Sequence, residues 1–504
     1  MKIRILIGFI ACYSSLLAQP LSTNQIADLA NRQLHPALQT LVQFLSIPNV
    51  ANVPGQMEDN ILWMQKACED RGFTVQRLPN EGHDLVFATL VNNPKLPTLL
   101  VYWHIDGQPV DPSKWNQSDP FTPTLKKPTI DGWETLDINK LKQDFDPEWR
   151  IFGRSSSDDK SPGIMFFYAM DALKQSGTPI PFNIKIIMDP EEEMGSPHLA
   201  AAVSQYHDLL AADRLIILDG PVHPSGKPTL SFGARGIATL AITAYGPKMP
   251  LHSGHYGNYA PNPALELAQL LASMKDKNGR VVIPGYYDGI EISTAVRKDL
   301  EATPDDAEAI GNMLGFSHPD SVGHTLQEAL QYPSLNIVGM SCGWVGNQAR
   351  TIVPADATAN LDMRLVKESD PVRLLGLVRQ WITDQGYHIC DGPPTDEERA
   401  EYGKLVSFSS EISYNAFRTD LGTPIDLWLT AALTQAHGEK PVRIRTGGGS
   451  VPISPFVETL KIPAVLVPLV NGDNNQHSPN ENLRLGNFLD GIKSCMAILQ
   501  QPWE

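Results

Sequence analysis

The sequence predicts an α/β fold with a mostly parallel central sheet and an inserted α+β domain. A chain of 504 residues is too long for one compact core and indicates about two domains. Beyond residue 90, short apolar runs alternate with helical segments, which is the pattern of strands covered by helices on both faces. Residues 236–415 depart from this pattern, so we assign them to a second domain, inserted between residues 19–235 and 416–504 of the first.

The N-terminus has the features of an export signal. Lys2 and Arg4 precede an apolar stretch, and small residues then lead to a cleavage site after Ala18. The stretch is too short to span a bilayer, and no other segment reaches about twenty apolar residues. We expect residues 1–18 to be removed and the mature protein to be periplasmic or secreted. Lipidation at Cys12 is the alternative, although the residues before it match that signal poorly.

The secondary structure can be predicted in chain order from the apolar pattern. Residues 23–46 form a helix, because their apolar side chains recur at helical spacing, and residues 163–173 form another. Continuous apolar runs predict the strands of the first domain, at residues 98–103, 184–188, 215–218 and 464–469. In the inserted domain we expect strands at 237–244 and 359–366, a helix at 263–274, and an exit linker at 391–401.

The net charge and the cysteines limit the ligands and the cross-links that the protein is expected to have. Forty basic and 56 acidic residues give a net charge of −16, which repels nucleic acid and suits cationic ligands or metal ions. Of the five cysteines, Cys12 lies in the signal, and the other four are widely spaced with no CxxC pair. We expect these four to be buried thiols, although an exported protein could also form a disulfide.

Ligand-type side chains follow each of the four predicted strands of the first domain. His104, the Glu192–Glu193 pair, Asp219 and His477 come within a few residues of the strand ends. In open α/β sheets, ligands bind at the carboxyl ends of the strands, so we expect these side chains to share one edge of the sheet.

Three local motifs refine this site. In His104-Ile105-Asp106, both polar side chains can face one way, so that His104 binds a metal and Asp106 holds its ring. Small residues lead into Asp158-Asp159-Lys160, which indicates a tight loop that points a carboxylate inward; a solvated helix start is the alternative. The glutamates that follow the strand at 184–188 are expected to supply one metal ligand and one general base.

In this order, the motifs resemble those of the dinuclear zinc metallopeptidases, a family that includes carnosinases, bacterial dipeptidases, acetylornithine deacetylase and aminoacylases. The resemblance covers nearly all of the mature chain and implies a zinc-peptidase-type catalytic domain with an inserted lid and dimerisation domain. It implies two zinc ions per subunit, for which manganese or cobalt can substitute. It assigns one zinc to His104 and Asp219 and the other to His477 and Glu193.

The resemblance also assigns roles to the remaining residues of the first domain. Asp158 is the carboxylate that bridges the two ions, with a cis peptide bond after it. Glu192 is the catalytic base, and Asp106 orients His104. Departures from the family pattern at Trp103, at Ser161 and in the long stretch 123–150 affect the expected pocket shape and leave every ligand in place.

Three further motifs of the family follow, two in the inserted domain and one in the second part of the first domain. His252 resembles the histidine that reaches a neighbouring subunit's site and stabilises the oxyanion, although a surface lid histidine would be the default interpretation. Arg364 resembles the arginine that binds a substrate carboxylate, a task that suits its forked guanidinium. Thr351 belongs to the same lid segment, and Gly449 and Ser450 to a glycine-rich turn that lines the substrate. A homodimer through the lid is implied if His252 acts in the neighbouring subunit.

These assignments predict an exported metal-dependent hydrolase that cleaves the amide bond of dipeptides or short peptides. A water shared by two cations would attack the bond, and Glu192 would move its proton to the leaving amine. An N-acyl amino-acid amidohydrolase would use the same site and is the alternative. A non-catalytic solute-binding protein is a weaker one, because it would need no base beside the ligands.

Overall fold

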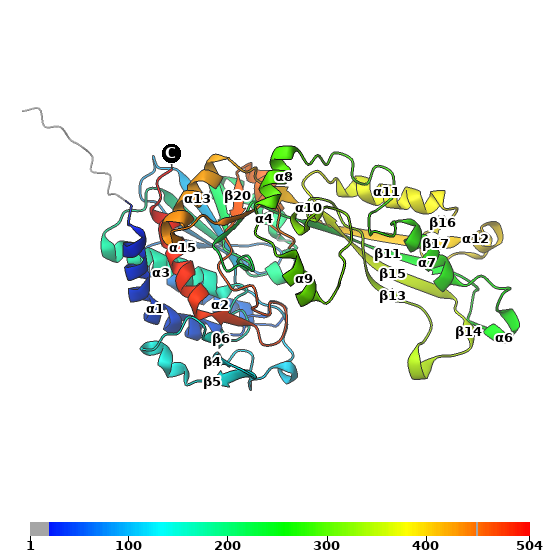
Figure 1. The fold of residues 1–504 in the computed structure, drawn as a ribbon, viewed down its shortest axis with the longest axis horizontal. Helices are drawn as coiled ribbons and strands as arrows, with labels where there is room; N and C mark the ends of the chain where they lie inside the picture. The colour runs from blue at the N-terminus through cyan, green and yellow to red at the C-terminus, as the bar shows by residue number, and fades with distance from the viewer. Residues whose placement is uncertain (1–19, 450–451, 504) are drawn as a thin grey trace, which may run out of the picture.

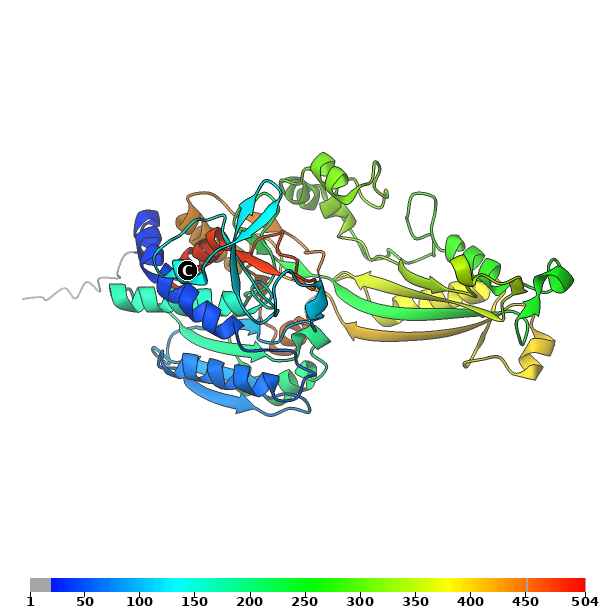
Figure 2. The ribbon, with the colours of Figure 1, turned by 90° about the horizontal axis from the view of Figure 1, so that it is seen from below.

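The computed structural model describes residues 20–449 and 452–503. The predicted signal, residues 1–18, lies outside the described residues, as does Ser450. The chain forms a broad α/β domain and a long, narrower domain that extends from one side of it (Figures 1 and 2). Within the described ranges, no helix combines the length and apolar character that crossing a membrane requires.

An eight-stranded sheet forms the centre of the larger domain. The strand order is β1-β2-β7-β3-β8-β20-β9-β19, and β3 pairs in parallel with both β7 and β8. The pairs β8–β20 and β9–β19 are also parallel, whereas β1–β2, β2–β7 and β9–β20 are antiparallel. The predicted mostly parallel sheet is therefore confirmed. Its strands are β1 (Thr74–Leu78), β2 (Leu85–Leu90), β3 (Thr98–His104), β7 (Asn183–Asp189), β8 (Arg214–Ile217), β9 (Thr229–Ser231), β19 (Val442–Ile444) and β20 (Ala464–Leu466).

Helices cover both faces of this sheet, because its central strands are apolar on both sides. On β3, Val101 and Trp103 pack into the core beneath one face, and Leu100 and Tyr102 pack into the core beneath the other. The first face is covered by α1 (Thr23–Leu45), α2 (Gln56–Glu69), α3 (Lys160–Ser176), α13 (Pro424–His437) and α15 (Leu485–Gln500). The second is covered by α4 (Leu199–Gln205), α5 (His207–Leu210) and α14 (Ser454–Leu460). Helices α1 and α3 confirm the two helices predicted for this domain.

A second, four-stranded sheet explains the long stretch 123–150. Its order is β21-β6-β4-β5, and β21 pairs antiparallel with β6, so that Asn482 lies opposite Phe152. This pairing places the chain that follows β6 beside the chain that precedes β21. The strands are β4 (Thr124–Thr129), β5 (Gly132–Thr135), β6 (Arg150–Phe152) and β21 (Asn482–Arg484).

The narrower domain, which we call the lid, is built on a five-stranded sheet with the order β13-β15-β11-β17-β16. Its strands all fall between Gly236 and Tyr414, within the segment assigned to the inserted domain. They are β11 (Gly236–Tyr245), β13 (Asn336–Ser341), β15 (Asp356–Leu365), β16 (His388–Cys390) and β17 (Leu405–Tyr414). Helices α7 (Pro263–Ser273) and α11 (Pro371–Asp384) contribute to the core on this sheet. The strands and the helix predicted for this domain are confirmed by β11, β15 and α7.

The predicted exit linker at residues 391–401 is wrong. This stretch lies inside the lid, between β16 and β17, and its second half is the helix α12 (Asp396–Glu401). Thr395 and Glu398 form a capping box at the start of α12. The acidic residues that suggested a linker therefore belong to the first turn of a helix, where carboxylates stabilise the free backbone N–H groups.

The four cysteines of the described residues form no disulfide. Cys68, Cys390 and Cys495 are buried, as expected, whereas Cys342 is only half-buried.

Candidate metal centre

The parallel pairing of β7, β3 and β8 brings three of the predicted site segments to one edge of the central sheet. His104 is the last residue of β3, and Asp219 follows β8. Glu192 and Glu193 lie on the short turn η3 (Glu192–Met194) that follows β7. His477 and Asp158 come from the two loops that the β6–β21 pairing places side by side.

The carboxylate of Asp158 lies between the two histidines. Its Oδ1 is 2.9 Å from Nε2 of His104, and its Oδ2 is 3.1 Å from Nε2 of His477. The same nitrogen of His477 is 3.2 Å from Oε2 of Glu193. Each oxygen of Asp158 thus faces a different imidazole, which is the arrangement that a bridging carboxylate needs.

Two groups of potential metal ligands result among the described residues of this edge. One is Asp158, Glu193 and His477, and the other is His104, Asp159 and Asp219; within each group the donor atoms lie within 4.8 Å of one another. The five residues predicted to bind metal are therefore neighbours in space. Asp159 was not among them.

Asp106 connects the two halves of the site. It is fully buried, and its Oδ1 lies 3.3 Å from Nδ1 of His104. Its carboxylate also accepts hydrogen bonds from the backbone N–H groups of Glu192, at 3.1 Å, and Glu193, at 3.0 Å. One carboxylate therefore fixes the ring of His104 and the turn that presents both glutamates.

Asp159 is an unpredicted part of the site. The Asp158–Asp159 peptide bond is cis, as the resemblance implies. Oδ2 of Asp159 accepts a hydrogen bond from the backbone of His104 at 3.3 Å, while Oδ1 is buried without a hydrogen-bond partner. A buried oxygen of this kind next to His104 and Asp219 fits a position beside a cation. The doubled aspartate was its only signal in the sequence.

The pKa values of several carboxylates of the site are raised, chiefly by burial and further by neighbouring negative charges. Burial, and then the charge of Asp158, raises the pKa of Asp219 to about 6 and that of Glu193 to about 7. Burial also raises the pKa of Glu192 well above its ordinary value. The hydrogen bond to Asp158 raises the pKa of His477 to about 9. Divalent cations would compensate this buried negative charge, and imidazole and carboxylate donors suit zinc, manganese or cobalt.

Glu481 holds the loop that carries Asp158. This carboxylate is fully buried and accepts backbone hydrogen bonds from Ser155 and Ser157, both at 2.9 Å, and from Asp158 at 3.0 Å. Glu481 also forms a salt bridge, because Nη1 of Arg154 lies 2.7 Å from its Oε2. The sequence motif His-Ser-Pro-Asn-Glu contained Glu481, but nothing in the pattern showed that its partner was the Asp158 loop.

A cavity of about 720 Å³ opens from this site toward the lid. The residues that line it include Glu192 and Asp219 from the catalytic domain, and Arg364 from β15 and Tyr414 from β17 of the lid. Gly449 lines it with the neighbouring residues of the glycine-rich turn. Trp103, where the sequence departs from the family pattern beside His104, is not among the residues that line the cavity. It packs against Phe166 and Phe167 in the core.

His252 and Thr351 lie elsewhere in the subunit. The two-residue strands β12 (Leu251–His252) and β14 (Ile352–Val353) pair with each other, and the N–H of Ser253 donates to the carbonyl of Thr351 at 3.0 Å. Both β14 and α6 (Ser253–Tyr256) lie at the end of the lid that is farthest from the catalytic domain (Figures 1 and 2). The structure thus brings Arg364 and Gly449 to the cavity but leaves His252 and Thr351 remote from the site of their own chain.

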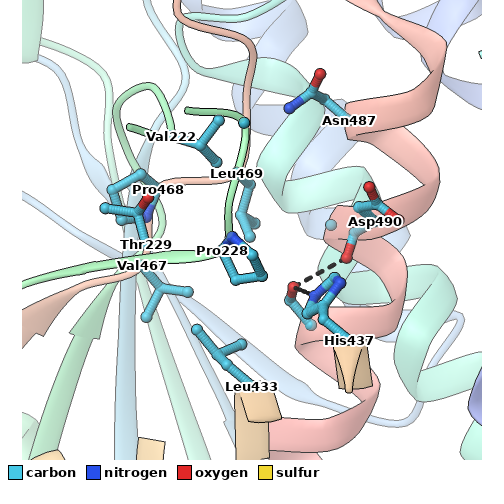
Figure 3. Close-up of a pocket in the computed structure, with 13 residues that line it drawn as sticks. Val222, Pro228, Thr229, Leu433, His437, Val467, Pro468, Leu469, Asn487 and Asp490 are labelled. Atoms are coloured by element: carbon cyan, nitrogen blue, oxygen red, sulfur yellow. Dashed lines mark hydrogen bonds between the residues drawn. The ribbon is translucent and has the colours of Figure 1, made fainter. Parts of the chain in front are cut away.

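A separate small recess of the catalytic domain contains a histidine and a serine (Figure 3). Nε2 of His437 is 2.8 Å from Oγ of Ser494, and this hydroxyl donates to the carbonyl of Asp490 at 2.9 Å. A serine in a helix commonly donates a hydrogen bond to the carbonyl one turn earlier, so the bond from Ser494 to Asp490 is an ordinary feature of α15. Burial lowers the pKa of His437.

Residues 100–501 match the peptidase family M20/M25/M40. The chain belongs to this family. It is therefore a metallopeptidase, and the expected family, fold and enzyme class are confirmed. The solute-binding alternative is thereby excluded as the main function.

Two relatives illustrate the range of similar proteins. The chain is 29% identical over 429 residues to the Cys-Gly metallodipeptidase dug1 of Schizosaccharomyces pombe, covering 82% of each protein. It is 26% identical over 439 residues to the Beta-Ala-His dipeptidase of Homo sapiens, covering 84% of this chain and 79% of the relative.

Solved structures also share the fold. The M20 family metallo-carboxypeptidase Sso-CP2 from Sulfolobus solfataricus superposes with a TM-score of 0.74 at 26% identity, covering 92% of this chain and 98% of that one. Human carnosine dipeptidase 1 gives a TM-score of 0.73 at 22% identity, covering 96% of this chain and 99% of that one.

Proposed function

We propose that the protein hydrolyses the amide bond of dipeptides or short peptides at this edge of the central sheet. The central observation is that the carboxylate of Asp158 contacts both His104 and His477 at the base of a cavity that also reaches Arg364 of the lid. Two zinc ions would be held by the predicted ligands, which are His104, Asp158, Glu193, Asp219 and His477. The names of the two relatives, both of them dipeptidases, support short peptides as substrates.

Each residue of the site then has its own role in the reaction. Bound metal ions polarise the substrate carbonyl and acidify water. Glu192 lines the cavity and is the base that accepts a proton from the attacking water and passes it to the leaving amine. Asp106 keeps His104 and the glutamate turn in place, and Arg364 binds the free carboxylate of the peptide.

A metal-dependence experiment with a substrate panel tests this function. We expect the purified protein to hydrolyse unblocked dipeptides, to lose this activity when a chelator removes the metal, and to regain it with zinc. Dipeptides and N-acetylated amino acids are compared in the same assay. Faster hydrolysis of the N-acetylated compounds would favour the amidohydrolase alternative, and full activity of metal-free protein would contradict the proposal.

Replacing Arg364 by Ala tests the carboxylate-binding role. We expect kcat/KM for unblocked dipeptides to fall by about 10–100-fold, because a hydrogen bond to a charged group contributes about 1.5–3 kcal/mol. The same dipeptides with a C-terminal amide should be affected much less, since they lack the charge that Arg364 recognises. Arg379→Ala, an exposed arginine on α11, is the matched control and should change neither value. An equal loss with both substrates would contradict the assignment.

We infer that the protein is a homodimer through the lid. Strand β13 is an edge of the lid sheet, all of its residues are exposed, and it carries the apolar side chains Ile337, Val338 and Met340. Trp344 and Val345, just beyond it, are exposed as well. An unprotected apolar edge of this kind favours pairing with another strand. A second copy is the proposed partner because the remote position of His252 requires another subunit if this residue serves a site.

Mixing two inactive variants tests whether His252 acts in the partner subunit. We expect His252→Ala and Glu192→Gln to be inactive alone and to regain part of the activity after subunit exchange. In the mixed dimer, one site combines an intact Glu192 with the intact His252 of the other chain. Val338→Lys should give monomers in sedimentation analysis, with loss of turnover. Failure of the mixture to regain activity, or a fully active monomer, would contradict the dimeric site.

We also propose that the protein is exported and loses residues 1–18. The described fold depends on residues that follow the proposed cleavage site: the backbone N–H of Leu21 donates to Oε1 of Gln500 at 2.7 Å, and its carbonyl accepts from Gln435 at 2.6 Å. N-terminal sequencing of the exported protein should begin at Gln19. A chain that keeps residues 1–18 inside the cell would be inconsistent with export.

A further inference from the structure

A further group of potential metal ligands, which includes a cysteine, lies on the lid, outside the catalytic cavity. It consists of His388 and Cys390 on β16 and Glu398 on α12, which we call the His388 cluster. One donor atom from each residue lies within 4.8 Å of the others. Figures 1 and 2 place α12 near the end of the lid that is remote from the central sheet.

The local structure holds these three side chains in place. His388 and Cys390 are two residues apart on a strand, so their side chains lie on the same face. The carboxylate of Glu398 is fixed by the capping box, in which Oε2 accepts from the N–H of Thr395 at 2.8 Å. Its other oxygen lies 3.3 Å from Nε2 of His388. The ring of His388 stacks on Tyr402, with centroids 3.7 Å apart and planes at 4°.

The donor types point to a transition-metal cation. A thiolate, an imidazole and a carboxylate together are typical ligands of zinc and of cobalt, and three protein donors leave a position for water. The side chains of His388 and Glu398 are 30% and 25% exposed, so an ion can enter from solvent.

From this juxtaposition we propose that the His388 cluster is an additional metal site that binds a zinc-type divalent cation. Strand β16 is the second edge of the lid sheet and, among the described residues, pairs with β17 alone. A cation held by His388, Cys390 and Glu398 fastens α12 over this edge and adds to the stability of the lid. The site is separate from the cavity at the edge of the central sheet and does not depend on the proposed peptidase chemistry.

Cobalt substitution tests the site through a signal that the catalytic centre cannot produce. The catalytic donors are imidazoles and carboxylates, so a near-ultraviolet thiolate-to-cobalt charge-transfer band reports a cysteine ligand. We expect this band when metal-stripped protein is loaded with Co²⁺. It should disappear in Cys390→Ser and persist in Cys342→Ser, the matched control on the same domain, and Zn²⁺ should displace it.

A further variant covers the case in which Cys390→Ser does not fold. His388→Phe keeps an aromatic ring to stack on Tyr402 but removes the nitrogen donor, and it should lose or strongly shift the band. Absence of the band from the wild-type protein, or its persistence unchanged in Cys390→Ser or His388→Phe, would overturn the proposal. Dipeptide hydrolysis, measured in parallel, reports the catalytic centre separately.

Discussion

Replacing Glu192 by Gln will lower turnover by about 10²–10⁴-fold, the range typical for removal of a general base. The substitution keeps the shape of the side chain and removes only its ability to accept a proton. Metal content should remain close to that of the wild type, because the predicted ligands are all other residues. The measurements are kcat on an unblocked dipeptide and metal analysis of the same preparation. Wild-type turnover by the variant would exclude Glu192 as the base.

The neighbouring Glu191 provides the control for this experiment. Its side chain is buried away from the cavity, and its Oε1 accepts a hydrogen bond from the backbone of His83 at 3.2 Å. Glu191→Gln makes the same chemical change one residue away, so turnover should be nearly unchanged. If both variants lost activity equally, the loss would reflect disruption of the turn rather than a missing base.

The central sheet could be predicted because its strands are buried on both faces. A strand such as β3 then becomes a continuous apolar run, and the ligand-type residue that ends it marks the edge of the sheet. The same reasoning failed at residues 391–401, where local composition resembled a linker. What makes this stretch a helix is the reciprocal bonding of Thr395 and Glu398, and its position inside the lid depends on the pairing of β16 with β17.

The site could be predicted only in part, for a related reason. The residues at strand ends were found because the sheet itself aligns them. Asp159 and Glu481 were missed as parts of the site because their roles depend on contacts between loops that are far apart in the chain. The positions of His252 and Thr351 depend on the length and direction of the lid, which no local pattern encodes. The sequence could name these residues by resemblance but could not place them in space.

Replacing Glu481 by Gln will destabilise the protein by about 3–5 kcal/mol, the usual effect of removing one partner from a buried ion pair. The side chains of both Glu481 and Arg154 are almost completely buried, so the variant leaves the guanidinium charge without its partner. The amide also has one acceptor oxygen in place of two, and it loses hydrogen bonds from the loop 155–158. Denaturant unfolding of the metal-free protein measures the change, and weaker metal binding should accompany it because this loop carries Asp158.

The matched control is Glu58→Gln, in the first turn of α2. Glu58 lies 2.7 Å from Nη2 of Arg77, a contact as short as that of Glu481, but the side chains of Glu58 and Arg77 are 48% and 33% exposed. Solvent screens exposed ion pairs, so this variant should lose only about 0–1 kcal/mol. A difference between the two variants would show that burial, rather than the shortness of the contact, makes Glu481 important. If both variants unfolded at the same denaturant concentration as the wild type, Glu481 could not be what holds the Asp158 loop in position.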